Sequence, residues 1–324
     1  KKALQKLLLD YGGTRYKKSK VTEDLVVKTA TRKVGEGDIR GAIRVLSLNE
    51  TIAEATPETK EKLNGKHPHG EEVDETFSDA VDLKVTQIEE VIEAIKSFPI
   101  SSSSGIDGLR PRHLKDLISF TCGESAKKLL KAIASLSDLA KSGKICEGIL
   151  PIFYGASLLA FDKKKVDVRP IAVGMTLRRV AGKIVCYHVR EELSSVLAPV
   201  QVGFGVKGGA EALVHAVRCF ATAEYEKAMA IVKFDFKNAF NMLFRKLLLS
   251  EVEEACPEMS PMIRQAYRRY SNLIYDEEIF LSKRGVQQGD PLGPPAFCIG
   301  IMKMTHSLVS RLNGWYLDDG TIGD

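Results

Sequence analysis

Two short apolar segments that end in acidic residues constrain this chain more than any other feature. Residues 231–236 read Ile-Val-Lys-Phe-Asp-Phe and place Asp235 where a helical pattern begins. Residues 315–320 read Trp-Tyr-Leu-Asp-Asp-Gly and place Asp318 and Asp319 between an apolar approach and a glycine. Strand ends are where α/β folds build sites. If the two segments are neighbouring strands, all three carboxylates meet at one edge of a sheet.

Each acidic segment alone has an ordinary explanation. Asp235 is a suitable cap for the next helix, and Asp-Asp-Gly is a common turn. Adjacent carboxylates in a turn repel each other, however, and a bound cation offsets that cost. Oxygen ligands favour magnesium or manganese over zinc. The set suits two Mg²⁺ ions about 4 Å apart, which activate an attacking hydroxyl and stabilise a leaving phosphate oxygen.

Composition allows a polyanionic partner without requiring one. The chain has 324 residues, 44% of them hydrophobic, enough for one large domain or two modest cores. Its net charge is +5, and basic residues gather at 1–20 and 163–190, on either side of a mainly acidic stretch at 71–93. A basic run is more often a solvated face than a nucleic-acid surface.

The cysteines and the apolar runs indicate an intracellular protein. The six cysteines are widely separated, with no histidine at zinc-ligand spacing, which is typical of reduced thiols. No apolar run reaches the ~18 residues of a membrane helix, and no signal-peptide pattern is present. We expect no membrane partner and an intracellular location, the nucleus included, although no targeting signal is clear. Because the first residue is Lys1, we expect a fragment.

The order of patterns predicts an α/β fold. Residues 1–85 form a helical and loop-rich extension of no legible function, with a helix from Thr56-Pro57 to Gly65. A capping box at Thr86–Glu89 opens a helix that ends at Pro99. The further expected elements are helices at 111–119, 124–142, 176–197 and 209–225, paired strands at 157–161 and 168–173, a strand at 230–236, a hairpin at 274–281 and a helix from about 295 to 311.

Six sequence blocks resemble a known family. FDFKNAF (234–240), RGVQQGDPLGP (284–294) and YLDDG (316–320) resemble polymerase motifs A, B and C of reverse transcriptases, in that order. Upstream, SGIDGLRPRHLK (104–115), VRPIAVGMTLRRVAGKI (168–184) and QVGFGVKGGAEA (201–212) are similar to finger-region blocks of non-LTR (LINE-type) retrotransposon enzymes. The resemblance covers residues 100 to 320 and implies an α/β (α+β) fold: a partial right-hand polymerase with helical fingers and an antiparallel-sheet palm.

The resemblance also implies a domain organisation. Fingers with interleaved palm elements occupy 86–228, and a palm containing motifs A, B and C occupies 229–324. The chain ends five residues after Asp319. We therefore expect the return strand of the last hairpin to be barely present and the thumb to be absent. Little processive synthesis is expected from this chain alone.

In such an enzyme the partners are an RNA template, a DNA primer and deoxynucleoside triphosphates, and the cofactor is a pair of Mg²⁺ ions, with Mn²⁺ as a substitute. Asp235 and Asp318 would ligate metal directly, Asp319 would complete the acidic site, and Phe236 would add its backbone carbonyl. Phe240 matches the steric gate, a ring that leaves no room for a 2′-hydroxyl. Its alternative reading is a core residue of an amphipathic helix.

The remaining site residues are expected to bind the nucleotide, the template or the primer. Arg169 and one of Lys163 and Lys164 would bind the triphosphate. Gln288 and Gly289 would let the backbone approach the nucleotide and template. Template or primer contacts are expected from four residues, for three of which surface solvation is an equal alternative: Arg178, Arg179 and Lys183, and in addition Tyr316.

Two other functions stay open. An RNA-dependent RNA polymerase shares the carboxylates, but Phe240 and a YLDD turn in place of the usual GDD disfavour it. A degenerate or domesticated element could act only as a nucleic-acid-binding protein, and the intact carboxylates argue against decay in this region. The sequence does not identify protein partners.

Overall fold

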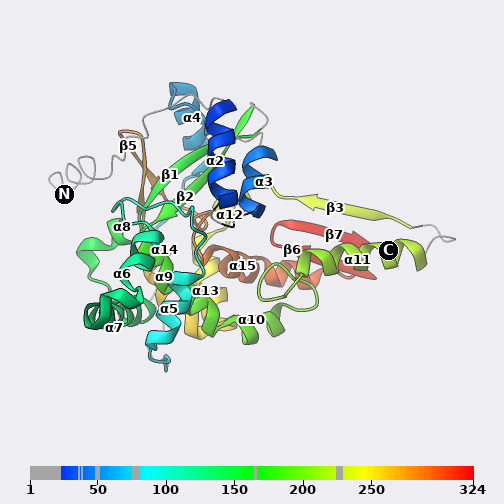
Figure 1. Ribbon diagram of the computed structural model, residues 1–324. Helices are drawn as coiled ribbons and strands as arrows, with labels where there is room; N and C mark the ends of the chain where they lie inside the picture. The colour runs from blue at the N-terminus through cyan, green and yellow to red at the C-terminus, as the bar shows by residue number, and fades with distance from the viewer. Residues whose placement is uncertain are drawn as a thin grey trace.

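The computed structural model describes residues 23–35, 37, 39–47, 52–74, 81–163, 166–223 and 229–324. It has a mixed α/β fold, as the sequence predicted. The described strands form two sheets, a four-stranded one in the order β2-β1-β4-β5 and a three-stranded one in the order β3-β7-β6 (Figure 1). Helices surround the first sheet, and the second projects to one side together with α11.

The four-stranded sheet is built from two hairpins. β1 (Ala156–Lys163) and β2 (Asp167–Gly174) pair antiparallel, and β4 (Ser271–Tyr275) pairs antiparallel with β5 (Glu278–Ser282). β1 and β4 join the hairpins through a short parallel pairing. Both predicted hairpins are confirmed. The sheet joins strands from both sides of the expected boundary at 228/229.

The three-stranded sheet contains both acidic segments. Its strands are β3 (Ile231–Asp235), β6 (Leu312–Tyr316) and the central β7 (Asp319–Gly323). All five residues of β7 pair antiparallel with β3 on one side and with β6 on the other. The expectation that this return strand is barely present was wrong. Gly320 permits the pairing, because a Cβ there would lie 2.5 Å from the ring of Trp315 on β6.

Helices make up most of the remaining described chain. The α-helices are α2 (Glu23–Gly35), α3 (Ile39–Ser47), α4 (Pro57–Lys66), α5 (Ile88–Lys96), α6 (Pro111–Leu117), α7 (Gly123–Lys141), α8 (Leu150–Phe153), α9 (Thr176–His188), α10 (Arg190–Leu197), α11 (Gly209–Ala223), α12 (Ala239–Met242), α13 (Arg245–Ala255), α14 (Ser260–Tyr267) and α15 (Gly293–Ser307). Single 3₁₀ turns occur at η1 (Phe120–Cys122), η2 (Glu147–Ile149) and η3 (Pro257–Met259).

Two local predictions needed correction. The helix expected at 176–197 is divided at Val189 into α9 and α10. The capping box of α5 lies one residue later than predicted: Gln87 is the N-cap, and its backbone N–H donates to the Glu90 carboxylate at 2.8 Å. Thr86 is not available as the cap, because its hydroxyl donates to Asp138 of α7 at 2.7 Å. The contact of Thr86 with α7 therefore moves the N-cap of α5 from Thr86 to Gln87.

Three apolar clusters hold these layers together. The largest joins α9, α10 and α13–α15 to Trp315, and thus anchors the three-stranded sheet to the helical body. A second lies between α5, α7 and α9. The third packs Leu63 of α4 on the four-stranded sheet. Burial of such side chains is the main favourable term in folding.

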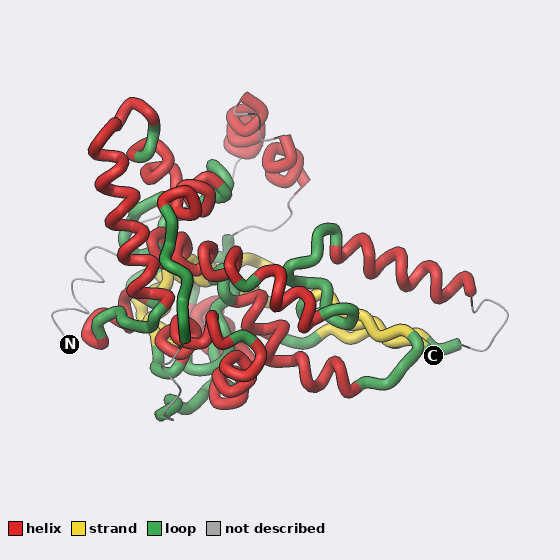
Figure 2. The backbone as a smooth tube through the Cα atoms, turned by 90° about the horizontal axis from the view of Figure 1, so that it is seen from below, coloured by secondary structure: helices red, strands yellow, loops and turns green. Residues whose placement is uncertain are grey.

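Helix α11 runs beside the three-stranded sheet (Figure 2). Its Leu213 lies against Gly314 of β6, and its Phe220 lies against Gly323 of β7, where a Cβ would collide with either side chain. The two glycines thus allow the helix to approach the strands. Among the described helices, none has the length and apolar character needed to span a membrane.

Candidate functional site

The strand register brings the predicted carboxylates together. Asp235 is the last residue of β3, Asp319 is the first residue of β7, and the two are direct partners in the pairing. Asp318 precedes Asp319 in the turn that follows β6. The two acidic segments are therefore neighbours, which meets the condition under which the three carboxylates share one edge of a sheet. The neighbour of β3 is the return strand β7 rather than β6.

Electrostatic effects at Asp318 show that the charges interact. Partial burial raises the pKa of the Asp318 carboxyl, and the negative charges of Asp319 and Asp235 raise that pKa further. Arg169 acts in the opposite direction and lowers it. Arg169 belongs to β2 of the four-stranded sheet. The structure thus brings one predicted triphosphate-binding residue within electrostatic reach of the acidic turn.

The donor set fits an oxygen-preferring cation in its chemistry. Carboxylates are the ligands that Mg²⁺ and Mn²⁺ prefer, and three of them lie at one end of the sheet. Their side chains are not gathered around one centre: among the described residues, no group of three or more acidic, histidine or cysteine side chains is arranged to hold a metal. The Lys233 ammonium lies 4.0 Å from an Asp319 oxygen.

A buried glutamine that the sequence analysis missed holds the acidic turn. Leu317 has a φ of +55°, in the left-handed region that non-glycine residues rarely adopt. Its backbone N–H donates to Gln201 Oε1 at 2.8 Å, and its carbonyl accepts from Gln201 Nε2 at 3.1 Å. Gln201 is completely buried. Its amide therefore fixes the backbone immediately before Asp318.

The segment around Gln201 forms part of the same structure. Val200 and Val202 exchange backbone hydrogen bonds with Trp315 at 2.7 and 2.8 Å. Gly203 N–H also donates to Gln201 Oε1, and a Cβ on Gly203 would lie 2.5 Å from the Leu317 nitrogen. The available sequence signal was a polar residue followed by glycine at the start of the block 201–212. That pattern indicates a close backbone approach but does not identify the partner.

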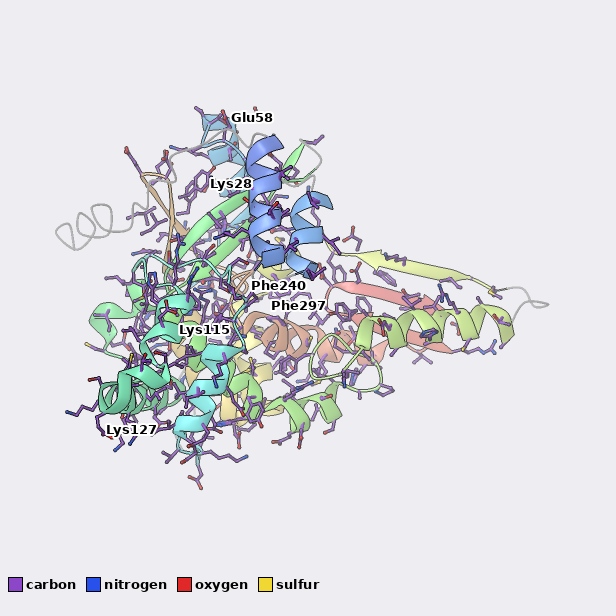
Figure 3. The ribbon with its side chains drawn as sticks, viewed as in Figure 1. Lys28, Glu58, Lys115, Lys127, Phe240 and Phe297 are labelled. Carbon is purple, nitrogen blue, oxygen red and sulfur yellow. The ribbon has the colours of Figure 1, made fainter. Side chains whose placement is uncertain are left out.

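The predicted gate residue lies in a short turn after β3. Asn238 has a φ of +57° and precedes the single turn α12, which contains Phe240. The Phe240 ring is half-buried and stacks on Phe297 of α15, with centroids 4.6 Å apart (Figure 3). The ring packs against the core, as the alternative interpretation expects, but α12 is a single turn rather than an amphipathic helix. A gate role is compatible with this packing and stays a prediction.

The loop at 284–292 ties the Phe240 turn to β2. Val286 N–H donates to the Phe240 carbonyl at 2.8 Å, and the Gln288 carbonyl accepts from Ala172 N–H at 2.7 Å. Gly289 is exposed with a φ of +114°, and a Cβ there would lie 2.7 Å from the Ala172 oxygen. Glycine is therefore required at this position. The structure places Gln288 and Gly289 beside the strand that carries Arg169.

The structure corrects the role that the sequence predicted for Arg178. Expected to contact template phosphates, it is only 1% exposed and forms an ion pair with Asp290. Its Nη1 donates to the Tyr154 carbonyl at 2.8 Å and to Gln287 Oε1 at 3.0 Å. A guanidinium used in this way cannot reach a nucleic acid on the surface. The residue is a structural link between α9 and the loop at 284–292.

Arg179 is also turned inward. It is 7% exposed, donates to the Ser103 carbonyl at 2.6 Å and lies over the Phe98 ring. Lys183, one turn further along α9, places its ammonium 4.6 Å from the same ring centroid. α9 packs against two core clusters, which explains why so much of this basic helix is buried. Arg179 is therefore excluded as a surface contact, whereas partly buried Lys183 stays a prediction.

The roles expected of three other residues, Lys163, Lys164 and Tyr316, stay predictions. Lys163 ends β1, but its side chain is not among those described, and Lys164 lies outside the described residues. Tyr316 is 37% exposed and pairs with Asp319 in the register of β6 and β7.

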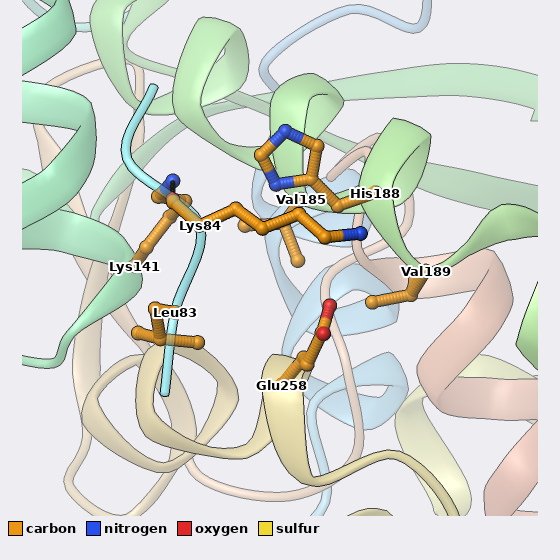
Figure 4. A pocket seen from close by; sticks show the side chains of 7 residues that line it. All are labelled: Leu83, Lys84, Lys141, Val185, His188, Val189 and Glu258. Carbon is orange, nitrogen blue, oxygen red and sulfur yellow. Dashed lines mark hydrogen bonds between the residues drawn. The ribbon is translucent and has the colours of Figure 1, made fainter. Parts of the chain in front are cut away.

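A small polar pocket is lined entirely by residues outside the predicted site (Figure 4). Its ionisable lining residues are Lys84, Lys141, His188 and Glu258. Lys141 donates to the Lys84 carbonyl at 2.5 Å, and His188 Nε2 lies 2.6 Å from Glu90. These bonds join α9 to α5, and α7 to the segment that precedes α5. The pocket is thus a structural junction.

One comparison with known proteins is consistent with a polymerase-like site. No protein-family model matches the chain. The chain is 24% identical over 229 residues to the "Probable RNA-directed DNA polymerase from transposon BS" of Drosophila melanogaster. The match covers 67% of this chain and 24% of the relative, so the chain spans about a quarter of the length of that relative. Together with the paired acidic segments, this similarity supports a reverse-transcriptase-like domain.

Proposed function

We propose that this chain is the catalytic region of an RNA-directed DNA polymerase of the non-LTR retrotransposon type. It adds deoxynucleotides to a DNA 3′-hydroxyl while copying RNA, and pyrophosphate is released. The observation that carries the proposal is the pairing of Asp235 with Asp319 next to Asp318, whose pKa both neighbours raise. The relative named as an RNA-directed DNA polymerase supports the choice of template and product.

The acidic residues have distinct roles in this proposal. Asp235 and Asp318 hold two divalent ions, assisted by Asp319 and the Phe236 carbonyl. Bound Mg²⁺ or Mn²⁺ supplies positive charge where the hydroxyl is deprotonated and the leaving phosphate oxygen develops charge. Gln201 keeps Asp318 at the required place through the Leu317 backbone. No protein side chain acts as the nucleophile, because the primer supplies it.

The surrounding residues bind and select the nucleotide. Arg169 supplies positive charge for triphosphate oxygens beside the acidic turn. The loop with Gln288 and Gly289 presents its backbone close to β2, and Gly289 lets that backbone approach the nucleotide and template. Phe240 lies in the turn that follows Asp235 and excludes a ribose 2′-hydroxyl. In this arrangement residues 86–228 serve as fingers with interleaved palm elements, and residues 229–324 serve as the palm.

Metal binding tests the site without requiring polymerisation. Trp315 is the chain's one tryptophan and lies three residues before Asp318, so its fluorescence reports on Mn²⁺ binding. We expect Asp318→Asn to weaken Mn²⁺ binding at least about tenfold, because a ligand charge is lost. Asp276→Asn is the control: Asp276 lies in the turn between β4 and β5 of the other sheet, away from the acidic turn. Equal Mn²⁺ affinity in the wild type and Asp318→Asn would contradict the site.

Primer extension tests the reaction. A DNA primer on an RNA template is incubated with this chain, Mn²⁺ or Mg²⁺ and one deoxynucleotide. We expect single-nucleotide addition by the wild type and by Asp276→Asn, and none by Asp318→Asn, which should still fold. Extension that survives Asp318→Asn would refute the assignment. Retained RNA binding with no extension by the wild type would favour a protein that only binds nucleic acid.

A further inference from the structure

Residues 56–74, here called the strap, belong to the N-terminal extension 1–85, for which the sequence indicated no function. Thr56 caps α4 by accepting from Thr59 N–H at 3.2 Å, and residues 67–74 continue beyond the helix. The strap contacts the four-stranded sheet, the turn after β3 and the chain before the 284–292 loop. It therefore touches elements that lie far apart in the sequence.

The first anchor is the four-stranded sheet. Leu63 of α4 is fully buried in the apolar cluster on that sheet. The Lys66 ammonium forms an ion pair with Asp167 at the start of β2. At the exposed side of the helix, Lys60 lies 2.8 Å from Glu278 of β5. These contacts fix α4 to the sheet that carries Arg169.

The second anchor is the turn that contains Phe240. The side-chain amides of Asn238 and Asn241 both donate to the Lys66 carbonyl, at 2.8 and 2.9 Å. Asn241 Nδ2 also lies 3.2 Å from Asn238 Oδ1, and Asn241 is 5% exposed. The Lys66 carbonyl at the end of α4 thus accepts hydrogen bonds from two residues that flank Phe240 in the chain.

The third anchor lies beside the strand that leads into the 284–292 loop. Gly70 is packed so closely on the Lys283 carbonyl that a Cβ there would collide with it. The Tyr270 hydroxyl donates to the Gly70 carbonyl at 2.7 Å, and Arg269 pairs with Glu72 at 2.8 Å. The strap is therefore held on both sides of the Phe240 turn.

From these contacts we propose that the strap is a positioning element that sets the place of Phe240 and thereby the discrimination between deoxyribose and ribose. The inference rests on the proposed function. Asn238 sits in a left-handed conformation, which surrounding bonds must maintain. Val286 N–H holds the Phe240 carbonyl from the opposite side. Steric exclusion of one hydroxyl depends steeply on ring position, so freeing one side of the turn lowers selectivity more than it lowers nucleotide binding.

The test compares two variants of the strap contacts. Asn241→Leu keeps the size of the side chain and removes the amide that donates to Lys66. Lys60→Met breaks an ion pair of the same helix and leaves the Phe240 turn untouched. Binding of dUTP and UTP, which differ at the 2′ position, is measured with Mn²⁺ through Trp315 fluorescence. We expect Asn241→Leu to reduce the dUTP preference by about tenfold and Lys60→Met to leave it within about twofold.

Hydrogen exchange supplies a reading that needs no nucleotide. In Asn241→Leu the amides of Asn241 and Val286 should exchange faster, because both lie in bonds of the Phe240 turn, whereas Lys60→Met should leave them unchanged. Asn238→Gly, which adopts the same backbone conformation and removes one amide, should give an intermediate result even if Asn241→Leu folds poorly.

The outcomes distinguish a failure of the strap proposal from a failure of the proposed function. Unchanged exchange in both asparagine variants overturns the strap as a positioning element, whatever the nucleotide data show. Faster exchange with an unchanged dUTP preference overturns its role in selectivity. A wild-type chain that binds dUTP and UTP equally overturns the gate, and with it the substrate preference of the proposed function, even where exchange shows that the strap holds the turn.

Discussion

At the scale of single residues, the acidic turn depends on a backbone conformation that is unfavourable by itself. A non-glycine residue at positive φ costs about 1–3 kcal/mol, and Leu317 adopts that conformation directly before Asp318. Two hydrogen bonds, one donated and one accepted by the Gln201 amide, offset this cost. The same bonds set the direction in which the chain enters β7.

Replacing Gln201 tests this arrangement. Gln201→Leu leaves the Leu317 N–H and carbonyl without their partner, so we expect a loss of about 1–3 kcal/mol in the free energy of unfolding, measured in urea. Mn²⁺ affinity should fall as well. Adding Leu317→Gly should recover part of the stability, because glycine adopts positive φ readily. Unchanged stability in Gln201→Leu would show that the amide does not hold the turn.

The raised pKa of Asp318 gives a pH dependence with a definite sign. Just above the ordinary aspartate pKa of 3.8, the Asp318 carboxyl is still protonated in the folded chain but already ionised in the unfolded chain. The contribution to stability is therefore full below the ordinary pKa and declines as pH rises through the folded pKa. Asp318→Asn should remove this decline, seen as a flatter curve of unfolding free energy against pH.

The same protonation opposes metal binding. Mn²⁺ requires the carboxylate, so the affinity of the wild type should rise as pH increases through the folded pKa of Asp318. In Asp318→Asn the rise associated with this group should be missing. A wild-type affinity that is independent of pH through that range would contradict a ligand role for Asp318.

At the scale of elements, α9 illustrates how a basic helix becomes part of the core. Its residues Val180 and Ile184 pack in one apolar cluster, while Ala181 and Val185 pack in another. With apolar contacts on two sides, little of the helix is left for solvent. Arg178 is consequently enclosed, and Asp290 together with backbone and side-chain acceptors compensates its burial.

Mutation of this buried pair should show strong coupling. Arg178→Met leaves Asp290 buried without its cation, and we expect a loss of about 3–5 kcal/mol in unfolding free energy. The double variant Arg178→Met with Asp290→Leu should be less destabilised than the single one, because no unpaired charge remains. Additive losses in chemical denaturation would refute the coupling.

At the scale of the whole molecule, the three-stranded sheet is not an independent unit. Trp315 of β6 is 1% exposed and belongs to the same cluster as α9, α10 and α13–α15. Thermal unfolding followed by Trp315 fluorescence should therefore coincide with unfolding followed by far-ultraviolet circular dichroism. An earlier fluorescence midpoint would mean that the sheet detaches before the helical body unfolds.

The sequence by itself determined the elements and the order of the chemistry-bearing segments. Short apolar stretches predicted both hairpins, and the acids at 235, 318 and 319 were expected where strands end, because apolar patterns and turn residues act over short stretches. Only the tertiary structure decided which polar groups face inward. Asp290 lies 112 positions after Arg178, and the Lys66 carbonyl lies 172 positions before Asn238. No local pattern encodes such partners, since burial and hydrogen bonding depend on which surfaces meet when the sheets and helices pack.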